Sequence, residues 1–377
     1  MSAALRAGYK QTEVGVIPEE WEVACVGDAF EVCNNLRLPI SQAVREQMVG
    51  DFPYYGPTNI QGWINEFRVD GEYALIGEDG DHFLKWRTQP MTLLVRGRFN
   101  VNNHAHLVHG SKNLTEWFYW YFANRDITAS LTRQGASRYK LNKATLVQLP
   151  CALPSLPEQR AIATALSDVD ALLSKLDALI AKKRDLKQAA MQQLLTGQTR
   201  LPGFSGEWEV NRLGDVLKVR HGKSQHEVVV SGGIYPILAT GGEIGRTNVC
   251  LYDKPSVLIG RKGTIDKPQY QDSPFWTVDT LFYTELFNTV SPKFVYFKFL
   301  MIDWRSYNEA SGVPSLNAST IEKIEVAVPK LPEQTAIATV LCDMDAELTA
   351  LQARRDKTRA LKQGMMQELL TGRIRLV

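Results

Sequence analysis

The chain has 377 residues, of which 44% are hydrophobic and 22% are charged, as in an ordinary soluble globular protein. The formal net charge of +2 is too small to indicate nucleic-acid binding by itself, so a DNA-binding role would need locally concentrated basic residues. The five cysteines are scattered without CxxC spacing, which argues against a disulfide framework and against zinc. No apolar run is long enough for a signal core or a membrane span, so we expect a cytosolic (cytoplasmic) protein without membrane association.

Short sequence patches recur in chain order between the two halves. Residues 1–18 are polar and predict a loose lead-in. EEWEV in the first half and GEWEV in the second are each followed by a Gly-Asp pair, and ALIGEDG recurs as VLIGRKG, a strand that runs into a glycine turn. The sequences diverge between these patches, which predicts a shared α/β scaffold with different loops. The matched pairs are 19–23 with 206–210, 52–62 with 235–245, 74–80 with 257–263, and Leu141–Asn142 with Leu316–Asn317.

The strongest repeat spans residues 156–201 and 331–376. Both segments begin with LPEQ and end near LLTG, and 28 of their 46 aligned positions are identical, far more than chance allows. Pro and Glu in the first turn and a closing glycine predict one long helix in each copy. About 40 residues at ~1.5 Å per residue make a rod of roughly 60 Å.

Apolar residues recur along each predicted helix at alternating steps of four and three, a narrow seam of coiled-coil type. A single helix cannot bury its own seam, so we expect the two copies to pack on each other. Arg355 stands where Ile180 continues the first seam, so the distal end of the second seam is weaker. The predicted helix-packing residues are Ile162, Leu166, Val169, Leu173 and Leu176 in the first copy, and Ile337, Leu341, Met344, Leu348 and Leu351 in the second.

Basic residues cluster in both globular parts and are candidates for DNA contact. Arginine and glutamine can read guanine and adenine edges, whereas lysine and serine more often hold phosphates. Solvated surface charge is the alternative interpretation for any single member. The candidates are Lys85, Arg87, Arg96, Arg98, Arg133, Gln134, Arg138 and Lys140 in the first part, and Arg220, His221, Lys223, Arg246, Arg261, Lys262 and Lys267 in the second.

Three other patterns resemble catalytic or metal sites. Gly222–Lys223–Ser224 resembles the end of a phosphate loop, but Leu217 stands where the first glycine of that loop is needed. His104, His106 and His109 lie close together, yet they cannot all share one strand face, which favours a structural or DNA-facing role over metal binding. Glu78 and Asp79 become Arg261 and Lys262 in the other half, so a chemistry common to both halves does not depend on them.

Motifs of known catalysts are missing from the sequence. HExxH and GxSxG are not found, and neither are the Asn/Asp-Pro-Pro-Tyr/Phe signature and glycine-rich cofactor loop of a DNA adenine methyltransferase. We therefore expect a non-catalytic recognition component, with no catalytic residue and no metal.

The two LPEQ…LLTG helices, the EWEV–Gly-Asp openings and the paired variable parts resemble the specificity subunit of a type I restriction–modification system, over essentially the whole chain. The resemblance implies an α/β (α+β) two-repeat fold: two globular target recognition domains separated by two long antiparallel coiled-coil helices with pseudo-twofold symmetry. The implied segments are 1–155 (first recognition domain), 156–200 (central helix), 201–330 (second recognition domain) and 331–377 (C-terminal helix).

The same resemblance implies a function. The chain would bind a bipartite, asymmetric site on double-stranded DNA and would scaffold two modification (methyltransferase) subunits, which restriction subunits join. S-adenosylmethionine and ATP would belong to those partners, and no cofactor to this chain. Two alternatives stay open: a coiled-coil protein–protein scaffold without direct DNA contact, and an enzyme that acts alone.

Overall fold

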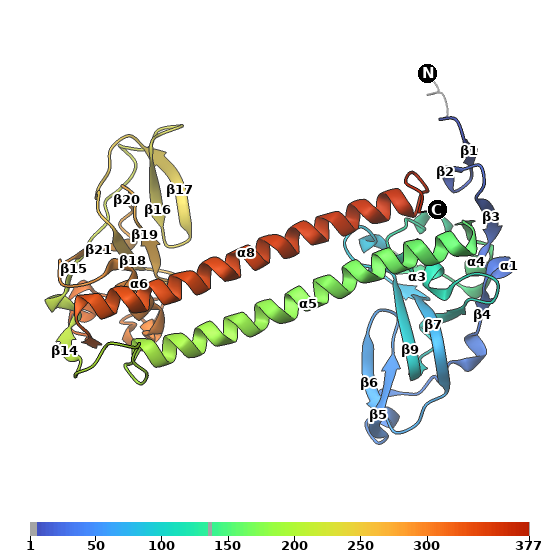
Figure 1. Cartoon of the computed structure of the whole chain (residues 1–377), viewed down its shortest axis with the longest axis horizontal. Helices are drawn as coiled ribbons and strands as arrows, with labels where there is room; N and C mark the ends of the chain where they lie inside the picture. The colour runs from blue at the N-terminus through green and yellow to red at the C-terminus, as the bar shows by residue number, and fades with distance from the viewer. Residues whose placement is uncertain (1–5, 135–137, 377) are drawn as a thin grey trace. The chain divides into compact units, whose positions relative to one another are not determined.

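The computed structural model describes residues 6–134 and 138–376, with the side chains of Gln134 and Arg138 outside the described part (Figure 1). The chain divides into two compact units. Unit 1 comprises Met1–Lys175 and Arg355–Val377, and unit 2 comprises Leu176–Arg354. The two long predicted helices are α5 (Leu156–Leu195) and α8 (Leu331–Leu369), and each contributes to both units.

Unit 1 is built on a six-stranded sheet in the order β4–β10–β7–β9–β5–β6. Its neighbours pair antiparallel, except for β5 and β9, which run parallel. The aromatic-rich helix α3 (Thr115–Ala123) packs across β7 and β9, and its Trp117 and Phe118 are fully buried. The strands are β4 (Glu31–Val32), β5 (Val49–Tyr55), β6 (Ile60–Ile64), β7 (Val69–Gly77), β9 (Thr92–Val101) and β10 (Ala105–His109).

Smaller elements complete unit 1. A three-stranded sheet in the order β11–β12–β8 stands beside the end of β7. The predicted loose lead-in is wrong for residues 9–18, which form a hairpin whose Tyr9 hydroxyl donates to the Gly372 carbonyl (3.0 Å). The elements are β1 (Tyr9–Thr12), β2 (Gly15–Pro18), β3 (Glu22–Cys25), α1 (Val26–Ala29), α2 (Gln42–Arg45), β8 (Asp79–Gly80), β11 (Thr132–Gln134), β12 (Arg138–Lys140), α4 (Lys143–Gln148) and β13 (Pro150–Leu153).

Unit 2 uses a related but shorter set of strands. A four-stranded sheet in the order β15–β21–β18–β19 packs against α6 (Pro292–Met301), and a three-stranded sheet has the order β17–β16–β20. The remaining elements are β14 (Glu209–Arg212), β15 (Leu217–Arg220), β16 (Tyr235–Ala239), β17 (Gly242–Thr247), β18 (Ser256–Gly260), β19 (Gln269–Gln271), β20 (Trp276–Thr277), β21 (Leu281–Leu286), α7 (Ala318–Glu322) and β22 (Glu325–Val328).

The repeated EWEV–Gly-Asp openings have the same structural role in both units. Each EWEV segment leads into a strand that pairs with the strand immediately before a long helix, β3 with β13 and β14 with β22. A Cβ atom on Gly27 would approach the Val147 Cβ to 2.9 Å, and one on Gly214 would approach the Glu322 Cβ to 3.2 Å. Glycine is needed here because the opening turn packs tightly against α4 or α7. The predicted α/β two-repeat fold is therefore confirmed.

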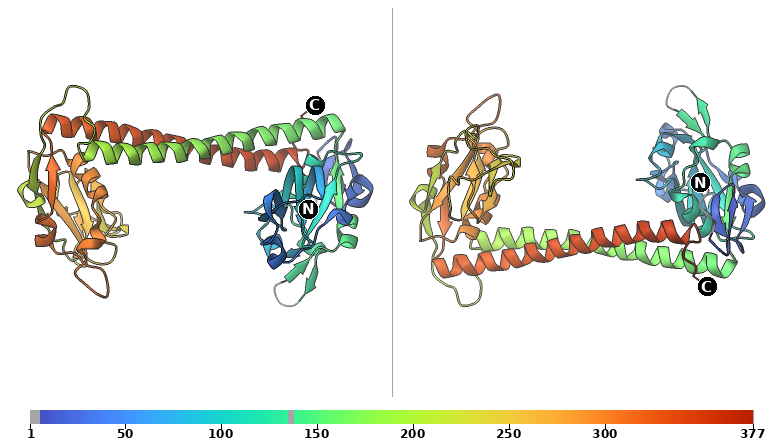
Figure 2. Two further views of the ribbon diagram at one scale, coloured as in Figure 1. Left: turned by 90° about the horizontal axis from the view of Figure 1, so that it is seen from below. Right: turned by 90° about the horizontal axis from the view of Figure 1, so that it is seen from above.

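The helices α5 and α8 run side by side and antiparallel within each unit (Figures 1 and 2). In unit 1 Asp170 pairs with Lys362 (2.6 Å), and in unit 2 the equivalent Asp345 pairs with Lys187. Each lysine also lies over an aromatic ring of the globular part, Lys362 over Trp120 at 4.9 Å and Lys187 over Phe297 at 5.5 Å. The two units therefore repeat the same contacts between helix and globular part.

The seam residues have two kinds of packing partner. Ile162 and Leu166 join the core of the globular part of unit 1, and Ile337 and Leu341 join that of unit 2, so this part of each seam is not reserved for the other helix. Further along the seams, Leu176, Ile180 and Leu348 are also buried, whereas Val169, Leu173, Met344, Leu351 and Arg355 are partly buried.

In each unit, a buried ion pair joins the first turn of one long helix to the segment that follows the other. In unit 1 the Arg375 guanidinium donates to both carboxylate oxygens of Glu158, with Nη2 2.8 Å from Oε2, and Trp21 Nε1 donates to the same carboxylate (3.0 Å). In unit 2 Arg200 binds both oxygens of Glu333 in the same way. Glu158 is fully buried and Glu333 nearly so. Thus the first turn of one repeat's helix holds the arginine that follows the other repeat's helix.

We expect Arg375→Met to destabilise unit 1 by about 3–5 kcal/mol, because it leaves the buried Glu158 carboxylate without its counter-charge. Arg373→Met is the matched control, since Arg373 is an exposed arginine that pairs with Glu368 at 3.4 Å. An exposed pair of this kind contributes ~0–1 kcal/mol. Urea unfolding of the two variants measures the difference. Equal losses in the two variants would contradict a special role for the buried pair.

Candidate nucleic-acid interface

The basic residues predicted on the sheet of unit 1 lie among carboxylates. Arg96 on β9 pairs with Glu72 (2.6 Å) and Glu116 (2.5 Å), and Arg98 pairs with Asp70 (3.2 Å). Hydrogen bonding to Glu72 raises the pKa of Arg96. The positive charge of this pair of arginines is therefore largely balanced within the sheet.

The structure does not gather all predicted basic residues of unit 1 in one place. Arg98 stands opposite Asp70 near the start of β7, whereas Lys140 pairs in register with Asp79 just after its end. Nine residue steps, most of them along β7, separate Asp70 from Asp79, which is at most roughly 30 Å at ~3.3 Å per residue. The remaining candidates follow the Asp79 end: Lys85 pairs with Asp81 (2.7 Å), Arg87 lies over Trp86, and Arg133 lies over Tyr139.

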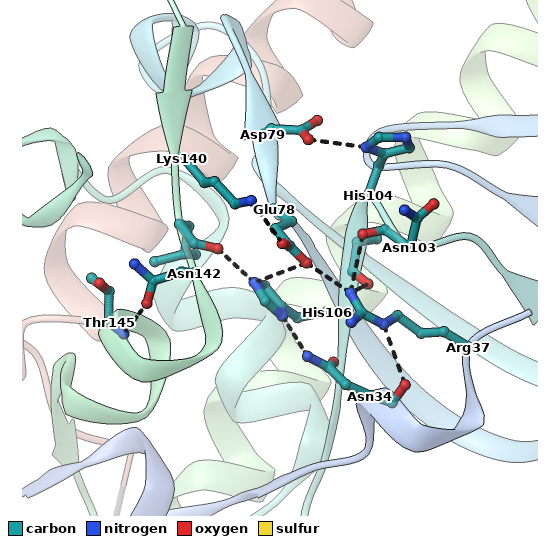
Figure 3. Close-up of polar contacts among 12 residues, drawn as sticks. Asn34, Arg37, Glu78, Asp79, Asn103, His104, His106, Lys140, Asn142 and Thr145 are labelled. Carbon is teal, nitrogen blue, oxygen red and sulfur yellow. Dashed lines mark hydrogen bonds and ion pairs between the residues drawn. The ribbon is translucent and has the colours of Figure 1, made fainter. Parts of the chain in front are cut away.

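Glu78 is the centre of a polar network at the end of β7 (Figure 3). Its carboxylate accepts from Arg37 Nη1 (2.7 Å) and lies 3.5 Å from Lys140 Nζ. Arg37 is held in turn by the Asn34 carbonyl (3.2 Å) and the Asn103 carbonyl (3.1 Å). The network therefore ties the hairpin β11–β12 to the main sheet through one partly buried carboxylate.

His106 lies at the inner side of this network and is completely buried. Its Nε2 is 2.6 Å from the Leu141 carbonyl oxygen, which can only accept, so Nε2 carries the proton. Its Nδ1 lies 2.8 Å from the Asn34 side-chain amide and therefore accepts. Burial lowers the pKa of His106, which keeps the ring neutral. This histidine is a structural member of the turn.

His82 packs close to the two glycines that flank the same turn, Gly77 and Gly80. A Cβ on Gly77 would come within 2.3 Å of its Nε2, and one on Gly80 within 2.7 Å of its Nδ1, so both glycines make room for the ring. Burial lowers the pKa of His82 as well. Two buried, neutral imidazoles thus pack beside the Glu78–Asp79 turn.

The three histidines that are close in sequence have different partners. His104 Nδ1 lies 2.9 Å from the Asp79 carboxylate, His106 is buried as described, and His109 Nδ1 lies 3.1 Å from the Glu72 carbonyl. Among residues 6–134 and 138–376, no three His, Cys, Asp or Glu side chains form a group that could hold a metal ion.

The equivalent turn of unit 2 keeps the backbone frame and inverts the charge. Glu78 N donates to the His104 carbonyl (2.7 Å) and Glu78 O accepts from Leu141 N (2.8 Å). In unit 2 Arg261 N donates to Thr280 O (2.8 Å) and Arg261 O accepts from Leu316 N (2.9 Å). The following asparagines both cap a helix: Asn142 Oδ1 accepts from Thr145 N at the start of α4, and Asn317 Oδ1 from Ser319 N at the start of α7.

The other predicted residues of unit 2 are spread over its sheets. Arg220 pairs with Glu285 (2.8 Å), Arg246 pairs with Glu243 (2.9 Å), and the His221 ring packs edge-on against Phe282. The backbone of Lys223 is bonded on both sides, its N–H to Thr277 O and its carbonyl to Trp276 Nε1. A Cβ on the preceding Gly222 would lie only 2.0 Å from the Val278 carbonyl, so this glycine serves close backbone packing.

A surface groove adjoins the charge-inverted turn of unit 2. It has a volume of about 510 Å³ and combines the turn glycine with cationic and amide side chains. Its Arg305 pairs with Asp266 (2.7 Å) while the arginine side chain stays 78% exposed. Neither Arg305 nor Arg37 of unit 1 lies in a patch that the two halves share, so sequence comparison of the halves could not find them. The lining residues are Gly263, Thr264, Ile265, Asp266, Lys267, Arg305, Asn308 and Pro314.

The fold and these paired turns define a duplicated α/β protein in which one frame carries two different sets of side chains. The family model for the type I restriction modification DNA specificity domain matches this chain twice, over residues 18–183 and 205–358. The chain therefore belongs to that family, which confirms the resemblance and the duplication predicted from its sequence.

Individual relatives agree with this assignment. A Haemophilus influenzae protein, provisionally named a type I restriction enzyme specificity subunit, is 28% identical over 355 residues, covering 85% of this chain and 86% of the relative. The type I restriction enzyme MjaVIII specificity subunit of Methanocaldococcus jannaschii is 22% identical over 420 residues, covering 96% and 94%.

Two solved structures share the fold. The crystal structure of the type I restriction–modification system S subunit from M. genitalium has a TM-score of 0.68 at 17% identity, covering 93% of this chain and 96% of that one. A chain from a structural study of complex assembly and conformational transition of the type I R-M system has a TM-score of 0.52 at 15% identity, covering 95% and 99%. Separately, no helix within the described residues has the length and apolar character needed to cross a membrane.

We expect the free energy of unfolding of unit 1 to fall as the pH drops below ~6.5, the pKa of an unperturbed histidine. Burial lowers the pKa values of His82 and His106, so the unfolded chain binds more protons than the folded unit below that pH. Unit 2 is the internal control, because its His221 and His226 are exposed. Hydrogen exchange of β7 and β10, corrected for intrinsic rates, should show weaker protection at pH 5.5 than at pH 7.5. Unchanged protection across that range would refute the assignment of neutral imidazoles.

Proposed function

We propose that this chain is the DNA-recognition subunit of a type I restriction–modification complex. Each globular part would bind one half of a bipartite, asymmetric site on double-stranded DNA. The observation that carries the proposal is the turn at Glu78 and Arg261, where the same hydrogen-bond frame presents opposite charges. A constant frame with exchanged polar side chains suits the reading of two unlike half-sites, because base edges differ in their donors and acceptors.

The proposal assigns catalysis to partners. The chain would scaffold two methyltransferase subunits, joined by restriction subunits, and those partners would bind S-adenosylmethionine and ATP. Exposed leucines on α5 support partner docking: Leu179 and Leu186 lie seven residues apart and are 38% and 47% exposed. Apolar residues at this spacing form one stripe on a helix and suit contact with another helix.

A protein–protein scaffold without DNA contact is the competing function, and the same leucines are compatible with it. A gel shift at increasing salt, with the methyltransferase subunits present, separates the two. We expect the affinity for DNA to fall steeply as salt rises, since each phosphate contact releases condensed counterions. If the complex does not bind DNA even at low salt, the protein–protein scaffold without DNA contact is the function that remains.

Labelled S-adenosylmethionine tests whether methyl transfer to DNA depends on the methyltransferase subunits. We expect the purified chain alone to transfer no methyl group to DNA and the assembled complex to do so. Clear transfer by the chain alone would revive the interpretation of an enzyme that acts without partners.

Exchange of residues 52–145 for the corresponding segment of another family member should change only one half of the methylated site. These residues begin within β5 and include β6 to β10 and the Glu78 turn, all within unit 1. Sequencing of methylated adenines in DNA modified by the complex measures the outcome. A change in both half-sites would show that the two domains do not read independently.

A further inference from the structure

The turn Arg261–Lys262–Gly263 presents two cations of unit 2 side by side in the sequence. Arg261 Nη1 donates to the Asp279 carbonyl (3.2 Å), which orients the guanidinium, and no carboxylate in the described part of the chain forms an ion pair with it. Lys262 is exposed, and no carboxylate of the described residues lies within ion-pair distance of its ammonium group. Gly263, with φ of +93°, ends the turn and opens the groove.

At the equivalent position, unit 1 carries a side chain of opposite charge. Lys262 aligns with Asp79, whose carboxylate is 40% exposed and contacts His104 at 2.9 Å. Lys262 bridges to Ser315 where Asp79 pairs with Lys140, so the two side chains project from matching backbone positions. One site therefore offers hydrogen-bond donors and the other offers acceptors.

The groove next to the turn adds further cations in unit 2. Lys267 is exposed, and Arg305 is held to Asp266 through Nε while most of its side chain faces solvent. The groove thus combines two cations with one carboxylate, and Arg261 and Lys262 precede its first lining residue. A concave surface with surplus positive charge suits a nucleic-acid backbone.

We propose that Lys262 reads a guanine of the half-site bound by unit 2, while Lys267 and Arg305 hold neighbouring phosphates. Guanine presents two acceptors, N7 and O6, in the major groove, and lysine or arginine is its usual partner. Arg261 is a positioning residue, because its bond to the Asp279 carbonyl holds the turn. By the same logic Asp79 accepts from an exocyclic amino group, as on cytosine, in the other half-site. This inference rests on the proposed function.

The test uses the complete complex of this chain with its methyltransferase subunits and the DNA site that it methylates. The half-site of unit 2 is the one left unchanged by the exchange of residues 52–145. Each guanine there is replaced in turn by 7-deazaguanine, which lacks the N7 acceptor. We expect one replacement to weaken binding by about 5- to 150-fold, the range of a good base contact.

Lys262→Gln should lose a similar factor on normal DNA and become insensitive to that 7-deazaguanine. Lys254→Gln is the matched control, since Lys254 is an exposed lysine of unit 2 outside the turn and the groove. The Lys254→Gln complex should lose as much affinity on the 7-deazaguanine site as the unsubstituted complex does. Lys262→Asp, which places the unit 1 residue in the unit 2 frame, should select against guanine at that position in the methylated sites.

Several outcomes would overturn the inference while leaving the proposed function intact. One is that the half-site bound by unit 2 contains no guanine. Another is that 7-deazaguanine weakens binding equally for Lys262→Gln and for the unsubstituted chain. A third is that Lys262→Gln weakens binding to all DNA sequences by the same factor and makes the affinity less dependent on salt. The last result would identify Lys262 as a phosphate contact. If the unsubstituted complex recognises no specific site at all, the proposed function itself fails.

Discussion

The reciprocal pairing of Glu158 with Arg375 and of Glu333 with Arg200 is the constraint on which both units depend. A carboxylate removed from water is costly unless a cation and further donors satisfy it, so each unit is complete only when the other repeat supplies its arginine. The pairing also fixes the direction of the helices, because the start of one must lie beside the end of the other. The repeated LPEQ and LLTG…R-L segments encode this requirement directly.

The two globular parts share the backbone frame of the turn at Glu78 and Arg261 but differ in the side chains that it carries. The backbone bonds around Glu78 and Arg261 are the same, and an asparagine caps the next helix in both units, yet the side chains at these two positions are of opposite charge. Buried imidazoles support the turn in unit 1, whereas a backbone carbonyl orients the arginine in unit 2. Architecture and recognition are thereby carried by different residues, and one can change without the other.

Much of the architecture could be predicted from sequence because it depends on repeats and periodicity. The long helices followed from matching residues at a fixed offset, and the paired openings and equivalent turns followed from short matching patches in the same chain order. Side-chain partnerships could not be predicted this way. Arg96 looked like a candidate for DNA contact, but two carboxylates distant in sequence surround it. Arg305 was missed because its groove forms only when separated segments fold together, and the hairpin at Tyr9 because its partner Gly372 lies at the far end of the chain.

The discontinuity of unit 1 has a consequence for synthesis on the ribosome. Unit 2 is one uninterrupted stretch, Leu176–Arg354, and has all its residues before the last part of α8 is made. Unit 1 begins first but must wait for Arg375 to cover the charge of Glu158. The earlier-made domain therefore finishes later, and a chain that stops short of Arg375 leaves the buried Glu158 without its counter-charge, so its unit 1 is less stable and more often unfolded.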